Sequence, residues 1–157
     1  MALQVRSWRE GFANILGDEL ISSAQARIEL ASAGLEARLR DLGARRLVAD
    51  LEGRPAGFST YGPSRDEDAD EDAGELMALF VDPSAWGRGV ASALVDGVLA
   101  ELCTDGFREA TLWSFDANQT ANRVYERRGF ARDGTENRRE PFGNVLLVRM
   151  RRALRGG

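Results

Sequence analysis

The segment VDPSAWGRGVASALV, residues 81–95, constrains the fold of this chain more than any other. It follows the apolar run ELMALFV, which has the length and composition of a buried strand, and it passes through a turn with two glycines into a helix. The helix carries an apolar stripe at i+4 spacing, made of Val90, Leu94, Val98 and Leu102. A buried strand that leads directly into such a helix predicts a sheet with helices packed on it, an α/β (α+β) fold.

The rest of the chain alternates between helical and strand patterns. Apolar residues one helical turn apart predict helices over residues 3–16 and 22–42. RRLVADLEGRPAGFSTYG places turn residues between two strand-like runs and predicts an antiparallel hairpin. ATLWSF and VLLVRM predict two further strands, and NQTANRVYERR predicts another helix. At 157 residues the chain has the size of one domain, so we expect residues 1–157 to form a single one.

A strongly acidic segment lies between the hairpin and the central strand. Six of the seven residues from Asp66 to Asp72 are acidic and the seventh is Ala. Such a segment cannot bury an apolar face, so we expect a solvated, mobile loop. The alternative is a functional loop that draws cationic amines, such as polyamines, aminoglycosides or basic peptides, toward a binding site.

The ionisable composition excludes several kinds of chemistry. The chain has no His, and all 21 of its basic residues are Arg. It therefore has no Ser–His or Cys–His catalytic pair, no His ligand for a metal and no Schiff-base lysine, and we expect no metal site. The single cysteine, Cys103, can form no internal disulfide, and its place on an apolar helix is that of a packed small side chain.

The net charge and the hydropathy of the chain exclude two classes of binding partner. The formal net charge of −4 gives no overall attraction to nucleic acid. We find neither a leader pattern nor an apolar run of about 18 residues, so we expect no membrane partner and a cytoplasmic location.

The two-glycine turn before the helix has the features of an anion-binding site. N–H groups in the first turn of a helix lack internal partners and carry partial positive charge. Gly87 and Gly89 lack a Cβ and let a phosphate approach the backbone amides of residues 87–91, and Arg88 adds a positive charge. The chain lacks the Lys of a Walker A loop and the glycine spacing of a Rossmann motif. By itself, the pattern also fits a structural tight turn.

A second motif, NQTANRVYERRGF, begins at Asn118. Asn118 is a favourable N-cap, and Ala121, Val124 and Tyr125 lie on one helix face. Alone, this motif also fits a capped helix with a core tyrosine. Together and in this order, the two motifs resemble those of the GNAT superfamily of acyl-CoA-dependent N-acyltransferases. The resemblance is strongest from residue 75 to residue 130.

The resemblance implies a GNAT-like mixed, mostly antiparallel central sheet with helices on both faces. The sheet would be split between the strands at about 75–81 and 110–116, and acetyl-CoA would enter the split as co-substrate. The slot would be lined by the backbone of Leu79, Phe80 and Val81. Family members normally have a strand before the first helix, but only residues 1–4 precede it here, so this strand is short or missing. An exposed sheet edge favours a homodimer.

The family's pyrophosphate pattern, Gln/Arg-x-x-Gly-x-Gly/Ala, falls on Trp86, Gly89 and Ala91. The resemblance therefore implies that the phosphates lie against Trp86, Gly87, Arg88, Gly89, Val90 and Ala91, and that Asn118 contacts the pantetheine arm. Trp86 departs from the pattern because an indole supplies no guanidinium. We expect the backbone amides and Arg88 to hold the phosphates, while Trp86 packs on the pantetheine or on the neighbouring loop.

Acetyl transfer from a thioester to an amine needs a neutral amine, a stabilised oxyanion and a proton for the leaving thiolate. The resemblance places Tyr125 at the thiolate, and a backbone N–H of residues 79–81 is the expected oxyanion donor. Glu75 is the candidate base; the alternatives are a water relay and an ordinary solvated side chain at a strand end. The resemblance, which extends to the first helix, further implies that Trp8 and Phe12 line the acceptor end, together with the final loop ENRREPFGN.

These expectations give a preferred function and two alternatives. The preferred function is an N-acetyltransferase that moves an acetyl group from acetyl-CoA directly to a primary amine of a small molecule or peptide. One alternative is a non-catalytic acyl-CoA-binding or interaction module with the same fold. The other is an unrelated α/β fold with a coincidental turn.

Overall fold

The computed structural model describes residues 2–12, 14–16, 37–138 and 144–155. Its centre is a six-stranded sheet with the strand order β1-β2-β3-β4-β6-β5. The strands are β1 (Arg45–Leu51), β2 (Arg54–Pro63), β3 (Ala73–Val81), β4 (Glu109–Phe115), β5 (Ala131–Arg138) and β6 (Leu146–Ala153). Among them, the β3–β4 pair is parallel and the other pairs are antiparallel. The predicted mixed, mostly antiparallel sheet is confirmed.

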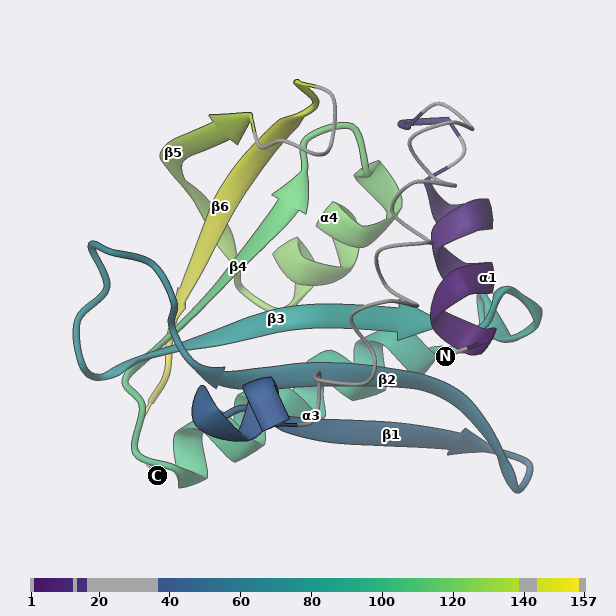
Figure 1. Cartoon of the computed structure of the whole chain (residues 1–157), viewed down its shortest axis with the longest axis horizontal. Helices are drawn as coiled ribbons and strands as arrows, with labels where there is room; N and C mark the ends of the chain where they lie inside the picture. Colours follow the sequence, from purple (N-terminus) through teal and green to yellow (C-terminus); the bar gives the residue numbers. More distant parts are fainter. Residues whose placement is uncertain (1, 13, 17–36, 139–143, 156–157) are drawn as a thin grey trace.

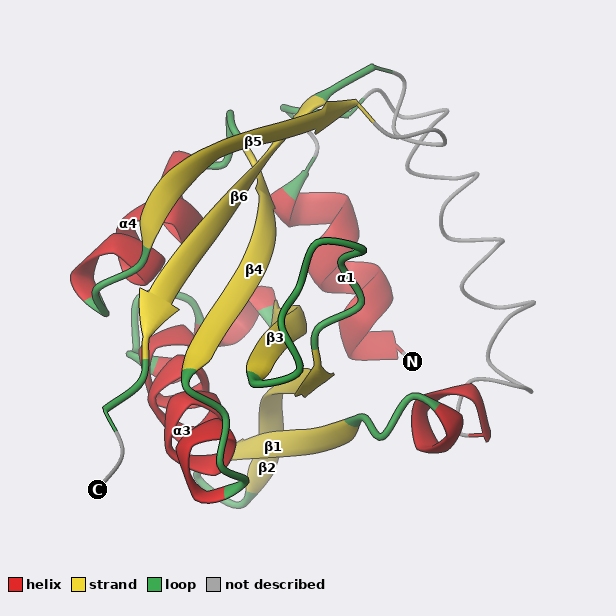
Figure 2. Ribbon diagram, turned by 90° about the vertical axis from the view of Figure 1, so that its left-hand side faces the viewer, coloured by secondary structure: helices red, strands yellow, loops and turns green. Residues whose placement is uncertain are grey.

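Helices cover both faces of the sheet (Figures 1 and 2). Helices α3 (Val90–Thr104) and α4 (Gln119–Arg127) lie on one face, and α1 (Ala2–Gly11) lies on the other. A short 3₁₀ helix, η1 (Pro83–Ala85), connects β3 to the glycine turn. The first predicted helix ends at Gly11 in the structure, earlier than expected. Residues 37–41 are helical, and the rest of the second predicted helix lies outside the described residues.

The apolar stripe of α3 forms the main core against the sheet. Its buried members, Leu94, Val95, Val98, Leu99 and Leu102 among them, pack on apolar side chains of β2, β3, β4 and β6. Gly74 on β3 lets the helix come close, because a Cβ there would lie 2.6 Å from Leu102 Cδ2. Burying each such leucine stabilises the fold by about 2 kcal/mol. The stripe read from the sequence is thus the contact surface of α3.

The two ends of the sheet were predicted unequally well. The β1–β2 hairpin is present, and its turn residues Glu52 and Gly53 both have positive φ, 53° and 75°. Strand β5 was not predicted, since the sequence analysis treated residues 136–144 as a loop. Its sequence, ARDGTENR, is polar and almost wholly exposed, so it has no apolar alternation to reveal a strand.

The sheet splits between β3 and β4. These strands pair in parallel only over four residues each, Ala73–Leu76 with Glu109–Leu112. On its other side β3 carries one extra residue, Met77, because Tyr61 and Thr60 of β2 face Leu76 and Ala78. Such a bulge bends and twists the strand that carries it. From Met77 onward β3 therefore diverges from β4, as the predicted split requires.

Candidate active site

The slot between the diverging ends of β3 and β4 is the first part of the candidate site. Residues 77–81 of β3 have no ladder partner on the β4 side among the described residues. This segment contains Leu79, Phe80 and Val81, the residues expected to line the slot. Phe80 packs against Phe58 on the α1 face, with ring centroids 5.2 Å apart, while Leu79 and Val81 pack toward α3. Backbone groups along the slot are left for a strand-like ligand.

The glycine turn lies where β3 ends and α3 begins. Gly87 and Gly89 have φ of 74° and 81°, a conformation that costs other residues about 1 kcal/mol. A Cβ at either position would meet no atom within 4 Å, so the backbone angle rather than crowding requires glycine here. Gly89 is the N-cap of α3. Because it has no side chain, it provides no cap to the N–H groups of the first helical turn, which begins at Val90. The turn therefore offers uncapped donors to an anion.

Trp86 braces this turn. Its indole Nε1 donates a hydrogen bond to the backbone carbonyl of Val81 at 3.2 Å, which closes the turn onto the end of β3. Trp86 is nevertheless 48% exposed, so about half of the residue faces solvent. Trp86 thus has a structural contact where the family pattern has a polar side chain.

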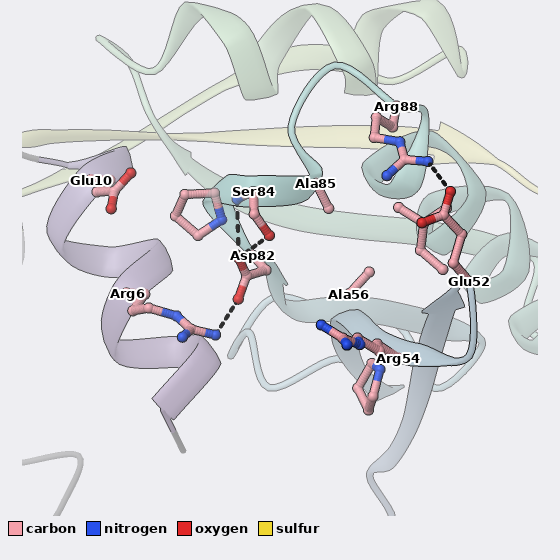
Figure 3. Close-up of a pocket in the computed structure, with 12 residues that line it drawn as sticks. Arg6, Glu10, Glu52, Arg54, Ala56, Asp82, Ser84, Ala85 and Arg88 are labelled. Carbon is pink, nitrogen blue, oxygen red and sulfur yellow. Dashed lines mark hydrogen bonds and ion pairs between the residues drawn. The ribbon is translucent and has the colours of Figure 1, made fainter.

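A cavity of about 860 Å³ opens on the outer side of the same turn, between α1, η1 and the β1–β2 hairpin (Figure 3). None of its described lining residues comes from β4 or α4, so it is separate from the slot. Within it, Arg6 of α1 is paired with Asp82, which also accepts hydrogen bonds from the Ser84 N–H and hydroxyl. The hydrogen bonds from Ser84, and then the contact with Arg6, lower the pKa of Asp82. Helix α1 is thereby tied to the turn.

Arg88, the expected phosphate ligand, is paired in this structure. Its Nη2 donates to Glu52 Oε1 at 3.0 Å, and both side chains are largely exposed. Exposed ion pairs contribute about 0–1 kcal/mol, so a phosphate could displace Glu52 at small cost.

Asn118 and Tyr125 both belong to α4. Asn118 is the N-cap, and its side-chain oxygen accepts a hydrogen bond from the Ala121 N–H at 3.3 Å. Tyr125 is buried against Phe130, and burial raises the pKa of its hydroxyl to about 12. No hydrogen-bond partner of this hydroxyl lies among the described residues. Tyr125 therefore keeps its proton at neutral pH and has it available to donate.

The sequence analysis missed Asn122, which fixes α4 to the end of β4. Asn122 is 4% exposed. It accepts a hydrogen bond from the Ser114 hydroxyl at 2.6 Å and donates to the carbonyls of Phe115 and Asp116. Its position on the buried face of the NQTANRVYERRGF helix was the available signal. Asn122 positions the helix that carries Asn118 and Tyr125.

Glu75 is buried rather than solvated. It is 2% exposed, at the paired end of β3 opposite Thr111. Arg65 donates to it three times, from its backbone N–H and Nε to Oε2 and from Nη2 to Oε1, at 2.9, 3.3 and 2.7 Å. The alternative of a solvated strand-end glutamate is wrong, because the residues after β2 fold back over this side chain.

The acidic loop is anchored, and the prediction of a wholly solvated, mobile loop is wrong at its first residues. Arg149 of β6 is 4% exposed and donates to Asp68 at 2.6 and 2.8 Å, to Asp66 at 3.3 Å and to Asp133 at 2.6 Å. Trp113 adds a hydrogen bond to Asp66 at 2.8 Å. The hydrogen bonds with Asp68 contribute most to a raised pKa of Arg149. Asp66 and Asp68 of the loop are thus held against the sheet by a buried cation.

Phe12, one of the two residues expected at the acceptor end, lies in an apolar cluster with Phe115. Phe12 packs edge-on against Phe115 with ring centroids 5.0 Å apart, in a cluster with Leu16 and Leu147. The side chain of Trp8 lies outside the described residues.

No described helix is both long enough and apolar enough to cross a membrane. No group of three or more His, Cys, Asp or Glu residues within the described ranges is arranged to hold a metal.

Several acetyltransferases are similar in sequence to part of this chain. The chain is 37% identical over 70 residues to a mycothiol acetyltransferase of Geodermatophilus obscurus, an alignment that covers 45% of this chain and 23% of that protein. It is 36% identical over 86 residues to a mycothiol acetyltransferase of Thermobispora bispora, covering 54% and 29%. The chain thus spans about a quarter of the length of these curated relatives.

Solved structures with the same fold superpose on most of the chain. The PaiA N-acetyltransferase of Thermoplasma acidophilum, in complex with coenzyme A, superposes with a TM-score of 0.74 at 18% identity, over 94% of this chain and 87% of that one. The ribosomal-protein-alanine N-acetyltransferase of Brucella melitensis gives 0.67 at 26% identity, over 80% and 78%. The profile of the Acetyltransferase (GNAT) family matches residues 6–130. With the split sheet and the glycine turn in place, the chain belongs to the GNAT acetyltransferase family.

Proposed function

We propose that this protein is an acetyl-CoA-dependent N-acetyltransferase that transfers the acetyl group directly to a primary amine of a small molecule or peptide. The observation that carries the proposal is the divergence of β3 from β4 directly beside the uncapped N-terminus of α3. A ligand with an anionic end and a narrow amide-bearing arm fits this arrangement. Acetyl-CoA has both, and its thioester supplies the activated acetyl group.

The turn and α4 would hold this co-substrate. The amides of residues 87–91 would bind the pyrophosphate, with Arg88 released from Glu52 to add its charge. The carboxamide nitrogen of Asn118 is left for the pantetheine arm, because only its oxygen caps α4. Trp86 would act by bracing the turn at Val81.

Two groups of the chain would act on the reacting atoms. A backbone N–H of β3 near the bulge would stabilise the oxyanion, since the strand there has no partner on the β4 side. Tyr125 would donate its proton to the leaving thiolate, and burial, which raises its pKa to about 12, keeps the hydroxyl protonated until the thiolate forms. Cys103 has no part in this scheme because its thiol contacts the Arg155 carbonyl at 3.0 Å, late on α3.

Glu75 is the candidate base, acting through water. A carboxylate has about four acceptor positions. Arg65 occupies two on Oε2 and one on Oε1, which leaves one on Oε1 for a water molecule. That water would take the proton from the amine. The pairing with Arg65 thus favours the water relay over direct contact.

The relatives support an amine acceptor without naming it. Two relatives similar in sequence are mycothiol acetyltransferases, and a structural neighbour is a ribosomal-protein-alanine N-acetyltransferase. On the α1 face, Phe12 and Phe115 would form an apolar wall beside the slot.

A CoA-release assay across a panel of primary amines tests the proposal. We expect turnover with at least one amine, and Tyr125→Phe should lower kcat about 100-fold. Tyr61→Phe is the matched control, because this tyrosine is equally buried but hydrogen-bonds Glu101 late on α3. If the wild type binds acetyl-CoA and no amine releases CoA above background, the chain is a non-catalytic acyl-CoA-binding module.

A further inference from the structure

The two edges of the sheet differ in their protection against pairing with another strand. Figure 1 shows β5 at the top and β1 at the bottom of the sheet. The pairing of β5 with β6 is interrupted between Arg132 and Glu136, and Gly134 within this break has a φ of 88°. A break of this kind, with charged side chains around it, prevents another strand from pairing. β5 is therefore a protected edge.

β1 has no such protection at its centre. Its register against β2 is continuous from Arg45 to Ala49 and shifts before Asp50. The extra residue at this shift, Ala56, lies on β2, so β1 itself keeps the alternation of exposed and half-buried residues. β2 is its sole strand neighbour in the described part of the chain. Leu47 and Ala49 pack toward the core, whereas Val48 is 59% exposed. A regular edge strand with an exposed apolar centre is a template for another strand.

The sequence of β1, RRLVADL, is complementary to itself in an antiparallel arrangement. When Val48 faces Val48 of a second copy, Arg46 of each copy faces Asp50 of the other, and symmetry gives this ion pair twice. Arg46, Val48 and Asp50 share one face because side chains alternate along a strand. Opposite charges directly across an antiparallel pair stabilise it. The charge pattern of β1 thus selects a second copy of the chain as its partner.

We propose that the protein forms a homodimer in which β1 pairs antiparallel with β1 of a second copy about a two-fold axis at Val48. This axis is compatible with either hydrogen-bonding pattern, since a residue can face its own copy in a hydrogen-bonded or a non-hydrogen-bonded pair. The contact is isologous and joins two six-stranded sheets into one. The proposal does not depend on the proposed acetyl transfer.

Charge reversal tests the register. Arg46→Asp places Asp against Asp twice, and Asp50→Arg places Arg against Arg twice. Each single variant should weaken dimerisation about tenfold at low salt, measured by sedimentation equilibrium. The double variant R46D/D50R restores both ion pairs in the proposed register and should dimerise like the wild type.

A mixture of the two single variants gives a sharper result. In a mixed dimer, positions 46 and 50 of the R46D chain both carry Asp, and both face an Arg of the D50R chain. Native mass spectrometry should therefore detect a heterodimer in the mixture at concentrations at which each variant alone is monomeric. Circular dichroism of each variant verifies that it is folded.

A disulfide tests the position of the axis. In a Cys103→Ser background, Val48→Cys places two thiols across the axis, with Cα atoms about 4.5–5.5 Å apart, which a disulfide can bridge. Oxidation should give a covalent dimer. Ala49→Cys should not, because its two copies lie two residues out of register. A wild type that is monomeric at all concentrations, or a dimer indifferent to the charge reversals, overturns the proposal.

Discussion

Replacing Arg149 by Met removes the cation that holds the acidic loop and β5 against the sheet. Arg149 is 4% exposed and binds three carboxylates, of which Asp66 and Asp133 are themselves mostly covered, with side chains 11% and 15% exposed. Removing one partner of a buried ion pair costs about 3–5 kcal/mol, because the remaining charge stays buried. Arg151 still contacts Asp133 at 2.6 Å, so we expect the lower end, about 3 kcal/mol at pH 7.

The loss should depend on pH in a defined direction. Burial raises the pKa of Asp133, but hydrogen bonds from the Thr135 N–H, Arg149 and Arg151 outweigh it and bring the pKa to about 2, from an ordinary 3.8. A lowered pKa stabilises the folded state above about pH 3.8, and this contribution disappears as the pH falls to about 2. Because Asp133 lies on an exposed edge strand, where solvent screens its charge, we expect it to contribute about 1–2 kcal/mol. The difference between wild type and variant should shrink by part of that amount, because the Thr135 N–H and Arg151 still donate to Asp133 in the variant.

Urea unfolding at pH 7 and at pH 2.5 to 3 is the assay. With an m-value of about 2 kcal/mol/M, a loss of about 3 kcal/mol lowers the midpoint at pH 7 by about 1.5 M. Arg127→Met on the exposed side of α4 is the control and should change stability by less than about 0.5 kcal/mol. If Arg149→Met unfolds at the same urea concentration as the control, the anchoring role assigned to Arg149 is refuted.

Three further substitutions test the turn and helix α4. Gly89→Ala should weaken acetyl-CoA binding in calorimetry and destabilise the fold by about 1 kcal/mol, whereas Gly106→Ala, which has a similar positive φ of 91° in open space, should cost the same stability and leave binding unchanged. Trp86→Phe keeps a ring but loses the hydrogen bond to Val81, so thermal unfolding should report a loss of about 1 kcal/mol. Asn122→Ala leaves two carbonyls and a buried hydroxyl with fewer partners and should cost about 2–3 kcal/mol in urea; an unchanged midpoint would contradict its role in fixing α4.

The sequence predicted the parts of the site whose chemistry is local. The strand, glycine turn and apolar helix are contiguous, so periodicity and the conformational needs of Gly87 and Gly89 were enough to identify them. The motif from Asn118 to Tyr125 is likewise one helix with its own cap. These segments would fold in the same way in many surroundings, and the structure has them as predicted.

What the sequence could not supply are contacts between distant segments. Arg149 is 83 residues from Asp66 and 81 from Asp68, and no periodicity connects them. The acidic run therefore predicted a solvated loop, although a buried arginine neutralises part of it. The burial of Glu75 was not predicted for a related reason, since the covering by Arg65 depends on how the chain turns after β2. Trp86 was expected to pack on the pantetheine or on the neighbouring loop, and its hydrogen bond to the Val81 carbonyl required coordinates.

The most direct measurement follows the acetyl group itself. Acetyl-CoA with an isotopically labelled acetyl group is incubated with the wild-type protein and a reactive amine, and both amine and protein are analysed by mass spectrometry. We predict label in the amine in a one-to-one ratio with released CoA, none on Cys103 at any time, and a large decrease for Tyr125→Phe but not for Tyr61→Phe. Label that accumulates on the protein, or an amine that stays unlabelled while acetyl-CoA is bound, would contradict direct acetyl transfer by this protein.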